Sequence, residues 1–203
     1  MSGKERTKKV DDEGPVICIS GMAGTGKSTL SKKLAAKYHL KYYSGGDALR
    51  ALAAKEGYDA SSLGFWESPE GLRFLERREK DAKFDKTVDD KLLECAKGGN
   101  VLLDSWTMAW LLKSGFKIWL LASMEKRAER VAQRDKLPVD EALRMLKQKE
   151  KKTKAIYKQL YGFDLGEDFK PFDLVLDTNN LNEEEVFQVL CNVIENIVLQ
   201  KKY

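Results

Sequence analysis

Residues 15–38 read PVICISGMAGTGKSTLSKKLAAKY, and this stretch decides the fold of the chain. It begins with a short apolar and β-branched run, 15–20, which is typical of a strand buried on both faces of a sheet. A glycine-containing segment, 21–26, interrupts the run. Residues 27–38 follow, with Leu30, Leu34 and Ala35 on one helical face. The sequence therefore predicts a buried strand, a tight turn and a helix, in that order.

The turn between this strand and helix carries a phosphate-binding motif. Residues 21–28, GMAGTGKS, match the pattern G-x-x-x-x-G-K-[ST] in full, and we call them the P-loop. Its glycines let backbone N–H groups turn inward around a polyphosphate at the helix N-terminus. We expect Lys27 to neutralise the β- and γ-phosphates and to act in catalysis, and the Ser28 hydroxyl to bind Mg²⁺. The predicted ATP-binding residues are Gly21, Met22, Ala23, Gly24, Thr25, Gly26, Lys27, Ser28 and Thr29.

The rest of the chain alternates short apolar strands with helices. Further strands are predicted at 41–43, 100–103, 116–121 and 172–176. Helices are predicted over 70–83, 84–97, 123–134 and 182–200, with another that ends at Lys55 and a long one from Pro138 to about Leu160. This order indicates an α/β protein with the three-layer P-loop NTPase fold, a five-stranded parallel sheet and helical insertions. Residues 1–14 are almost wholly polar and are predicted to be a disordered tail, so that 15–203 form the domain.

Composition narrows the class of protein. The 203 residues suit one compact domain, and the net charge of +4 is mild. The single histidine, His39, excludes His-based triads and His-metal sites, and the three cysteines lie far apart. The sequence has no apolar run of about 18 residues and no signal-peptide h-region. We therefore expect reduced thiols, no membrane span and a cytoplasmic location.

A carboxylate follows the predicted strand at 100–103. In a P-loop protein this position usually orients Mg²⁺ or its water, so Asp104 joins Ser28 as a predicted metal residue. GTPases are excluded, because residues 104–107, DSWT, do not match D-x-x-G and no N-K-x-D motif occurs. A motor or a helicase would need a larger domain than this chain provides. Among P-loop proteins, the class that remains is that of the small kinases.

The sequence resembles one family of such kinases over about residues 15–200. Residues 44–50, SGGDALR, look like the S-x-G-D-x-x-R acceptor motif of nucleoside monophosphate kinases. The order of the P-loop, this motif, a G-N-V strand, KIWL at 117–120 and RAER at 127–130 is similar to archaeal-type cytidylate kinases. So are YKQLYG at 157–162 and FDLVLDT at 172–178. The resemblance implies a kinase domain that uses ATP and Mg²⁺.

The resemblance also implies roles for individual residues. Arg50 would grip the acceptor phosphate, with Ser44 and Asp47 shaping its pocket. Arg130 would stack on the donor adenine, and Arg134 would reach the transferring phosphoryl group; both are therefore candidate catalytic residues. Residues of about 46–97 would bind the acceptor, and those of about 135–160 would be a mobile lid. The expected acceptor is a nucleoside monophosphate, CMP or dCMP first, and the expected partners are small nucleotides rather than nucleic acid.

The chain departs from the family at the acceptor side. The family typically has E-G-R-x-x-G-W where residues 104–110 read DSWTMAW, so the arginine expected to meet the acceptor nucleotide is Trp106. The indole of Trp106 either stacks on a base or fills the core. Two lid arginines align with Lys149 and Lys154, and a third aligns with Ile156. Lysine keeps the charge but loses the bidentate fork of arginine.

Other functions stay open at this point. The acceptor is CMP or dCMP, or the rebuilt site takes another small acceptor such as a different nucleotide. The changed acceptor motif either redirects the activity to such a substrate or weakens catalysis. Residues 126–158 hold twelve Lys or Arg against five Asp or Glu, a net charge of +7. A basic segment of this kind is also compatible with a nucleotide-dependent ATPase that binds RNA or the ribosome.

Overall fold

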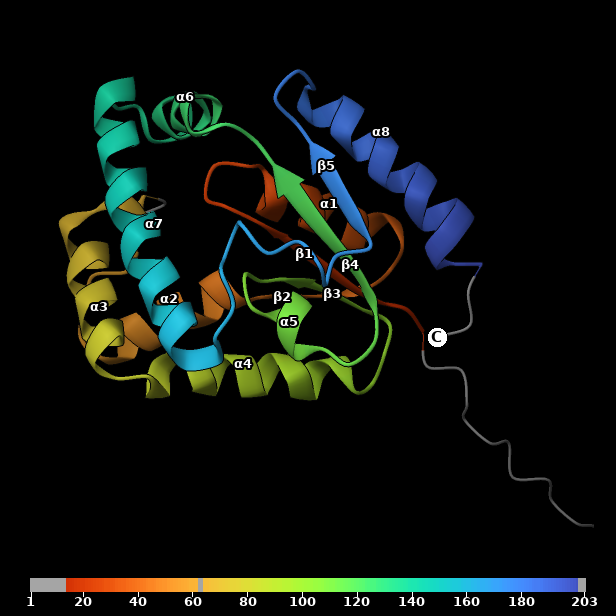
Figure 1. Cartoon of the computed structure of the whole chain (residues 1–203), viewed down its shortest axis with the longest axis horizontal. Coiled ribbons are helices and arrows are strands. Elements are labelled where there is room, and N and C mark those ends of the chain that lie inside the picture. The colour runs from red at the N-terminus through yellow and green to blue at the C-terminus, as the bar shows by residue number, and fades with distance from the viewer. Residues whose placement is uncertain (1–13, 62–63, 201–203) are drawn as a thin grey trace, which may run out of the picture.

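The computed structural model describes residues 14–61 and 64–200, and the predicted tail lies outside them apart from Gly14. The described residues form a five-stranded sheet in the order β2-β3-β1-β4-β5, and every neighbouring pair is parallel (Figure 1). The predicted fold class is therefore confirmed. The strands are β1 (Val16–Gly21), β2 (Lys41–Ser44), β3 (Val101–Asp104), β4 (Phe116–Leu121) and β5 (Leu174–Asp177).

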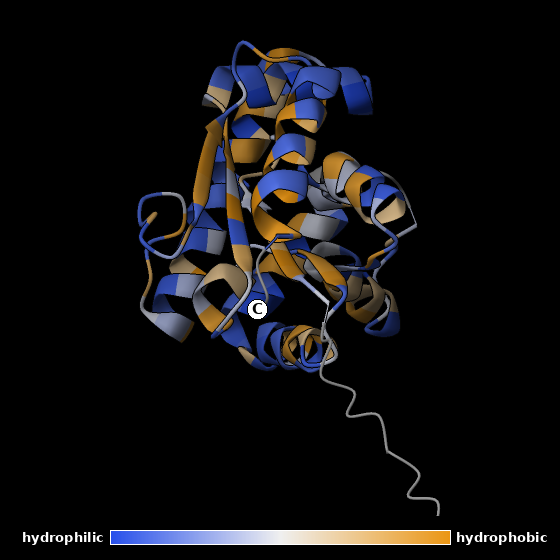
Figure 2. Ribbon diagram, turned by 90° about the vertical axis from the view of Figure 1, so that its right-hand side faces the viewer, coloured by the Kyte–Doolittle hydropathy of each residue, from blue (hydrophilic) through white to orange (hydrophobic). Residues whose placement is uncertain are grey.

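Helices cover both faces of the sheet because its strands are apolar on both sides. Ile17 and Ile19 point to the face covered by α1 (Lys27–Lys37) and α8 (Glu183–Val193), which continues as a π-helical turn at Ile194–Val198. Between them Cys18 points to the opposite face, which packs against α2 (Gly45–Lys55), α4 (Lys83–Ala96) and α5 (Met108–Leu111). Figure 2 shows the hydrophobic residues concentrated in the strands and on the inward turns of the helices.

Three helices form a second group beside the sheet. They are α3 (Pro69–Lys80), α6 (Met124–Asp135) and α7 (Val139–Tyr161), and α7 packs against the other two. In Figure 1, α3 and α7 stand at the left, on the side away from α8. Among the described residues, no helix combines the length and the apolar character needed to cross a bilayer.

Two predictions about elements need correction. Helix α5 has only four residues and was not predicted, because so short a segment shows no helical period. The last strand begins at Leu174 rather than at Phe172. The ring of Phe172 instead packs edge-on against Trp110 and Trp119, with centroid distances of 5.1 and 5.2 Å.

A close backbone approach positions the 3₁₀ turn Phe65–Glu67 at the start of α3. The Ser68 hydroxyl donates to the carbonyl oxygen of Phe65 at 2.7 Å and accepts from the N–H of Gly71 at 3.1 Å. A Cβ atom on Gly71 would lie 2.0 Å from that carbonyl oxygen. Glycine at position 71 is therefore required for the turn, and with it Trp66, to pack on α3.

We predict that Gly71→Ala destabilises the protein by about 1–3 kcal/mol, as overpacked cores do. For a chain of this size that corresponds to a melting temperature lower by several degrees, which a thermal scan measures. Gly98→Ala is the matched control, because nothing lies within 4 Å of its added Cβ. Equal melting temperatures for the two variants would contradict the packing described here.

Candidate functional site

One large cleft of about 1350 Å³ lies at the carboxyl edge of the sheet. The register places Ile19 of β1 and Ser44 of β2 beside Asp104 of β3, so the segments that follow these strands meet at the same edge. A pocket for one drug-sized ligand has roughly 300–1,000 Å³. The cleft is therefore large enough for two ligands of moderate size side by side.

The P-loop forms one wall of this cleft. Gly24 and Gly26 have φ values of 84° and 86°, in the left-handed region, and a Cβ on Gly24 would lie 2.8 Å from the carbonyl oxygen of Arg127. Gly26 caps the N-terminus of α1, whose N–H groups can then bind an anion. Of the nine predicted ATP-binding residues, the seven from Ala23 to Thr29 line the cleft.

The first two residues of the P-loop have other contacts. The carbonyl oxygen of Gly21 accepts a hydrogen bond of 2.5 Å from the indole N–H of Trp106. Met22 is buried, and its carbonyl oxygen accepts from the Thr25 hydroxyl at 2.9 Å. Gly21 and Met22 therefore do not line the cleft, and their carbonyl oxygens stabilise the turn.

The predicted metal residues lie together in the cleft. The Ser28 hydroxyl donates to one carboxylate oxygen of Asp104 at 2.5 Å, and the same oxygen accepts from the Tyr42 hydroxyl at 3.2 Å. Mg²⁺ prefers oxygen ligands and usually combines one or two carboxylates with ligand phosphates. Ser28 and Asp104 fit such an ion beside the P-loop.

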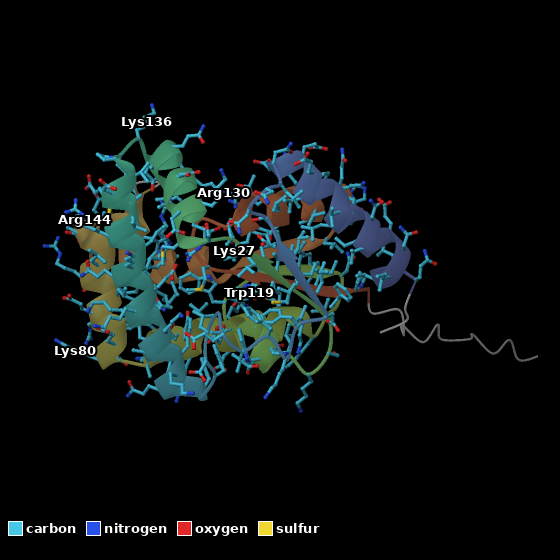
Figure 3. The ribbon with its side chains drawn as sticks, turned by 45° about the horizontal axis from the view of Figure 1, so that its top comes forward. Lys27, Lys80, Trp119, Arg130, Lys136 and Arg144 are labelled. Atoms are coloured by element: carbon cyan, nitrogen blue, oxygen red, sulfur yellow. The ribbon has the colours of Figure 1, made fainter. Side chains whose placement is uncertain are left out.

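Two arginines of α6 line the same half of the cleft. Arg130 donates to the hydroxyl and to the carbonyl oxygen of Thr178, at 3.1 and 2.7 Å, in the segment after β5. Arg134 forms a bidentate pair with Asp135, at 2.7 and 2.6 Å. Figure 3 shows Lys27 and Arg130 on the inner side of the molecule, whereas Lys80, Lys136 and Arg144 lie at its outer edge.

The predicted acceptor residues lie at the start of α2. Ser44 caps this helix by accepting from the N–H of Asp47 at 3.1 Å, and both residues line the cleft with Arg50. The guanidinium of Arg50 donates to the carbonyl oxygens of Ala60 and Ser61, at 2.6 and 2.8 Å. These bonds orient Arg50 and fix the segment that follows α2.

Trp106 is half-buried: it packs against two clusters of buried residues and also lines the cleft, so its ring fills part of the core and stays available to stack on a base. Lys27 Nζ lies 5.4 Å and Lys149 Nζ 6.0 Å from the indole centroid, within the range of cation–π attraction. The ring also meets Tyr157 edge-on at 6.4 Å. Trp106 therefore connects the P-loop lysine to α7.

The two lysines of the predicted lid have different surroundings. Lys149 lines the cleft, is only 8% exposed, and has its Nζ 5.5 Å from the centroid of Trp66 as well as near Trp106. Lys154 is not among the residues lining the cleft, and it pairs with Glu167 at 2.8 Å on the surface. Ile156, where a third family arginine aligned, is buried. Of these positions only 149 brings a cation into the cleft.

A buried group of polar side chains at the other end of the cleft was missed by the sequence analysis. We call it the carboxylate pocket; its members are Arg78, Asp85, Asp89, Thr107 and Tyr157. A usable signal existed, since two aspartates stand four residues apart beside the apolar stripe of α4. Like charges at this spacing disfavour a helix and therefore call for an explanation.

Hydrogen bonds satisfy much of the carboxylate pocket. Arg78 forms a bidentate pair with Asp85, at 3.1 and 2.5 Å, and donates to the Tyr157 hydroxyl at 3.3 Å. Asp89 accepts from the hydroxyls of Thr107 and Tyr161, both at 2.6 Å. Burial raises the pKa of Asp89 to about 6, although both hydroxyl donors act in the opposite direction. Asp89 thus remains mostly ionised at neutral pH.

A second buried ion pair holds the cleft together. Arg127 pairs with Glu150 of α7 and also donates to the carbonyl oxygens of Ala23 and Ala122, each at 3.1 Å. It therefore connects the P-loop and the start of α6 to α7.

Comparisons with known proteins agree on one family. The cytidylate kinase-like family matches residues 16–180. A cytidylate kinase of Methanocaldococcus jannaschii is 35% identical over 187 residues, which cover 90% of this chain and 98% of that protein. One of Pyrococcus horikoshii is 34% identical over 183 residues, covering 90% and 89%.

Solved structures agree on the fold. A shikimate kinase of Acinetobacter baumannii in complex with shikimate superposes with a TM-score of 0.55 at 17% identity, covering 91% of this chain and 95% of that one. The chain therefore belongs to the cytidylate kinase-like family and is a phosphotransferase of that type.

Proposed function

We propose that the protein transfers the γ-phosphoryl group of ATP to CMP or dCMP. The observation that carries this proposal is the division of one cleft into two halves, a cationic P-loop half and a carboxylate pocket, with Trp106 between them. Relatives named cytidylate kinase, about 35% identical over nine-tenths of the chain, support the choice of acceptor. Phosphoryl transfer needs both substrates in line and shielded from water, which a shared cleft supplies.

The donor half would hold the triphosphate. The N–H groups of residues 23–28 would surround the β-phosphate, and Lys27 would neutralise charge on the β- and γ-phosphates. Ser28 and Asp104 would hold Mg²⁺, which when bound neutralises charge on the β- and γ-oxygens. Arg130, oriented by Thr178, would lie against the donor adenine.

Arg134 would act at the transferring phosphoryl group. Its guanidinium now makes two parallel bonds to the carboxylate of Asp135. Phosphoryl oxygens accept the same bidentate pattern, so the arginine can exchange one anionic partner for the other. We take α7 as the lid, with Lys149 as the cation it brings into the cleft.

The acceptor phosphate would be held by Arg50 and Lys149. An indole cannot neutralise a phosphate, so Trp106 does not replace the arginine found in the family. Lys149 lies against the same ring and can supply the missing charge. A lysine makes no bidentate fork, so we expect a weaker hold on CMP than arginine would provide.

The proposed activity is tested by a coupled assay over the common nucleoside monophosphates with ATP. We expect turnover with CMP and dCMP above all others. Lys27→Ala should lower kcat about a hundredfold, a loss of about 3 kcal/mol of transition-state stabilisation, while the fold survives. Near-normal turnover in that variant would contradict the proposed role of the P-loop.

The same assay separates the alternative functions. Turnover with a different monophosphate would move the proposal to that acceptor. ATP hydrolysis stimulated by RNA, with binding that weakens steeply as salt rises, would replace the kinase proposal by an RNA-binding ATPase.

The role of Lys149 is tested against a matched lysine of the same helix. Lys149→Met should raise the KM for CMP about tenfold, near 1.4 kcal/mol, with little change in the KM for ATP. Lys154→Met removes only a surface pair with Glu167 and should leave both KM values unchanged. Equal effects of the two variants on the CMP KM would mean that position 149 does not hold the acceptor phosphate.

A further inference from the structure

The carboxylate of Asp104 is held by hydroxyl groups from two different elements. Asp104 is 3% exposed at the end of β3, and its Oδ2 atom accepts from the Ser28 hydroxyl at 2.5 Å and from the Tyr42 hydroxyl at 3.2 Å. An ionised carboxylate can only accept, so both hydroxyls donate. Among the described residues, the other oxygen, Oδ1, accepts no hydrogen bond and keeps its lone pairs for a ligand.

Tyr42 reaches Asp104 from the neighbouring strand. In the parallel pair of β2 and β3, Tyr42 lies opposite Leu102, and Ser44 lies opposite Asp104. Side chains two residues apart on a strand share a face, so Tyr42 and Asp104 are diagonal neighbours on the same face of the sheet. A tyrosine is long enough to cross this diagonal, and its hydroxyl meets the carboxylate there.

The phenol ring of Tyr42 is fixed by packing. It lies against the buried cluster that fills the space between the sheet and helices α1 and α8. Lys32 Nζ lies 5.6 Å from the ring centroid, within the range of cation–π attraction. Tyr42 is not among the residues that line the cleft, whereas Asp104 is. The Tyr42 hydroxyl therefore acts on a bound ligand through the carboxylate to which it donates.

A carboxylate that binds a metal ion is more effective when its orientation is fixed. Groups that hydrogen-bond a coordinating side chain hold it in place, and their loss typically lowers metal affinity about 10–100-fold. Mg²⁺ demands nearly ideal octahedral geometry, so it tolerates a misdirected carboxylate poorly. The Ser28 oxygen is itself a proposed ligand of the ion. The Tyr42 hydroxyl is thus the donor to Asp104 that has no proposed contact of its own with the metal.

We propose that Tyr42 is a positioning residue, whose hydroxyl orients the carboxylate of Asp104 for the Mg²⁺ ion that accompanies the nucleotide. This inference rests on the part of the proposed function that assigns Mg²⁺ to Ser28 and Asp104, and it adds the residue that holds the carboxylate. Strand β2 ends at Ser44, the N-cap of the helix that carries Arg50. The hydrogen bond therefore connects the proposed metal site to the strand that leads into the proposed acceptor residues.

The test removes only the hydroxyl group, with Tyr42→Phe, which keeps the ring and its packing. Calorimetry measures the Kd of a non-hydrolysable ATP analogue with Mg²⁺ and, in the presence of a chelator, without it. The ratio of the metal-free Kd to the Kd with Mg²⁺ measures how strongly the ion and the nucleotide favour each other's binding. We expect this ratio to fall by about tenfold in Tyr42→Phe, with the metal-free Kd unchanged.

Tyr43→Phe is the matched control. Tyr43 is the next residue of the same strand and packs against the cluster on the opposite face of the sheet, so its variant should keep the wild-type ratio. A folded Tyr42→Phe protein with the wild-type ratio would overturn the inference and leave Tyr42 a residue of the core. A rise of both Kd values by the same factor would overturn it as well, because that result indicates a disturbed P-loop.

A double-mutant cycle tests whether Tyr42 acts through Asp104. Asp104→Ala should itself lower the ratio of Kd values. Adding Tyr42→Phe to that variant should lower it no further, because the hydroxyl has lost the group that it orients. Equal effects of Tyr42→Phe in the two backgrounds would contradict this route.

The outcomes also distinguish this inference from the proposed function. A wild type whose affinity for the ATP analogue does not depend on Mg²⁺ overturns the proposed metal site and the role of Tyr42 together. A wild type that shows the Mg²⁺ effect but phosphorylates no monophosphate overturns the proposed transfer and leaves the role of Tyr42 intact.

Discussion

The guanidinium of Arg127 joins the three segments on which the cleft depends. It bonds the carbonyl oxygen of Ala23 in the P-loop, that of Ala122 before α6, and the carboxylate of Glu150 in α7. Removing one partner of a buried ion pair typically costs about 3–5 kcal/mol, because the remaining charge is left without compensation. The phosphate-binding turn and the helix that carries Lys149 are therefore held in a fixed relation. If α7 moves as the proposed lid, the movement has to take place around this anchor.

Charge is distributed along the cleft in an order that suits a nucleotide acceptor. Lys27 and Lys149 attract phosphate, whereas the carboxylate pocket keeps one net negative charge after Arg78 pairs with Asp85 and would repel it, which favours one orientation of the proposed nucleoside monophosphate. Trp106 separates the two ends, with Lys27 and Lys149 over its ring and Tyr157 at its edge. An arginine at this position would stand beside both lysines and would need a bound phosphate to offset their repulsion. The family's arginine is replaced by Trp106 in this chain, and the positive charge at this place comes instead from Lys149 of α7.

Local patterns in the sequence predicted most of the fold and the residues of the P-loop wall of the cleft. Strand β1, the P-loop and α1 follow from apolar periodicity and a complete motif. The prediction of Asp104 beside Ser28 came from a carboxylate that ends a predicted strand in a chain with a P-loop. The carboxylate pocket was not predicted in the same way, because Arg78, Asp89 and Thr107 come from α3, α4 and the segment after β3 and meet only in the folded chain. The resemblance to the family also gave Lys149 and Lys154 the same status, yet the packing of α7 turns one into the cleft and the other to the surface.

If ATP and the acceptor lie together in this one cleft, a single molecule with adenosine and cytidine joined through five phosphates should occupy both halves. Its Kd, measured by calorimetry, tests this directly against the Kd values of ATP and CMP. Because the second contact is made within one complex, we predict that the linked molecule binds about a hundredfold or more tighter than ATP, and that either nucleotide displaces it. A Kd equal to that of ATP, with no displacement by CMP, would show that the two halves do not form one site.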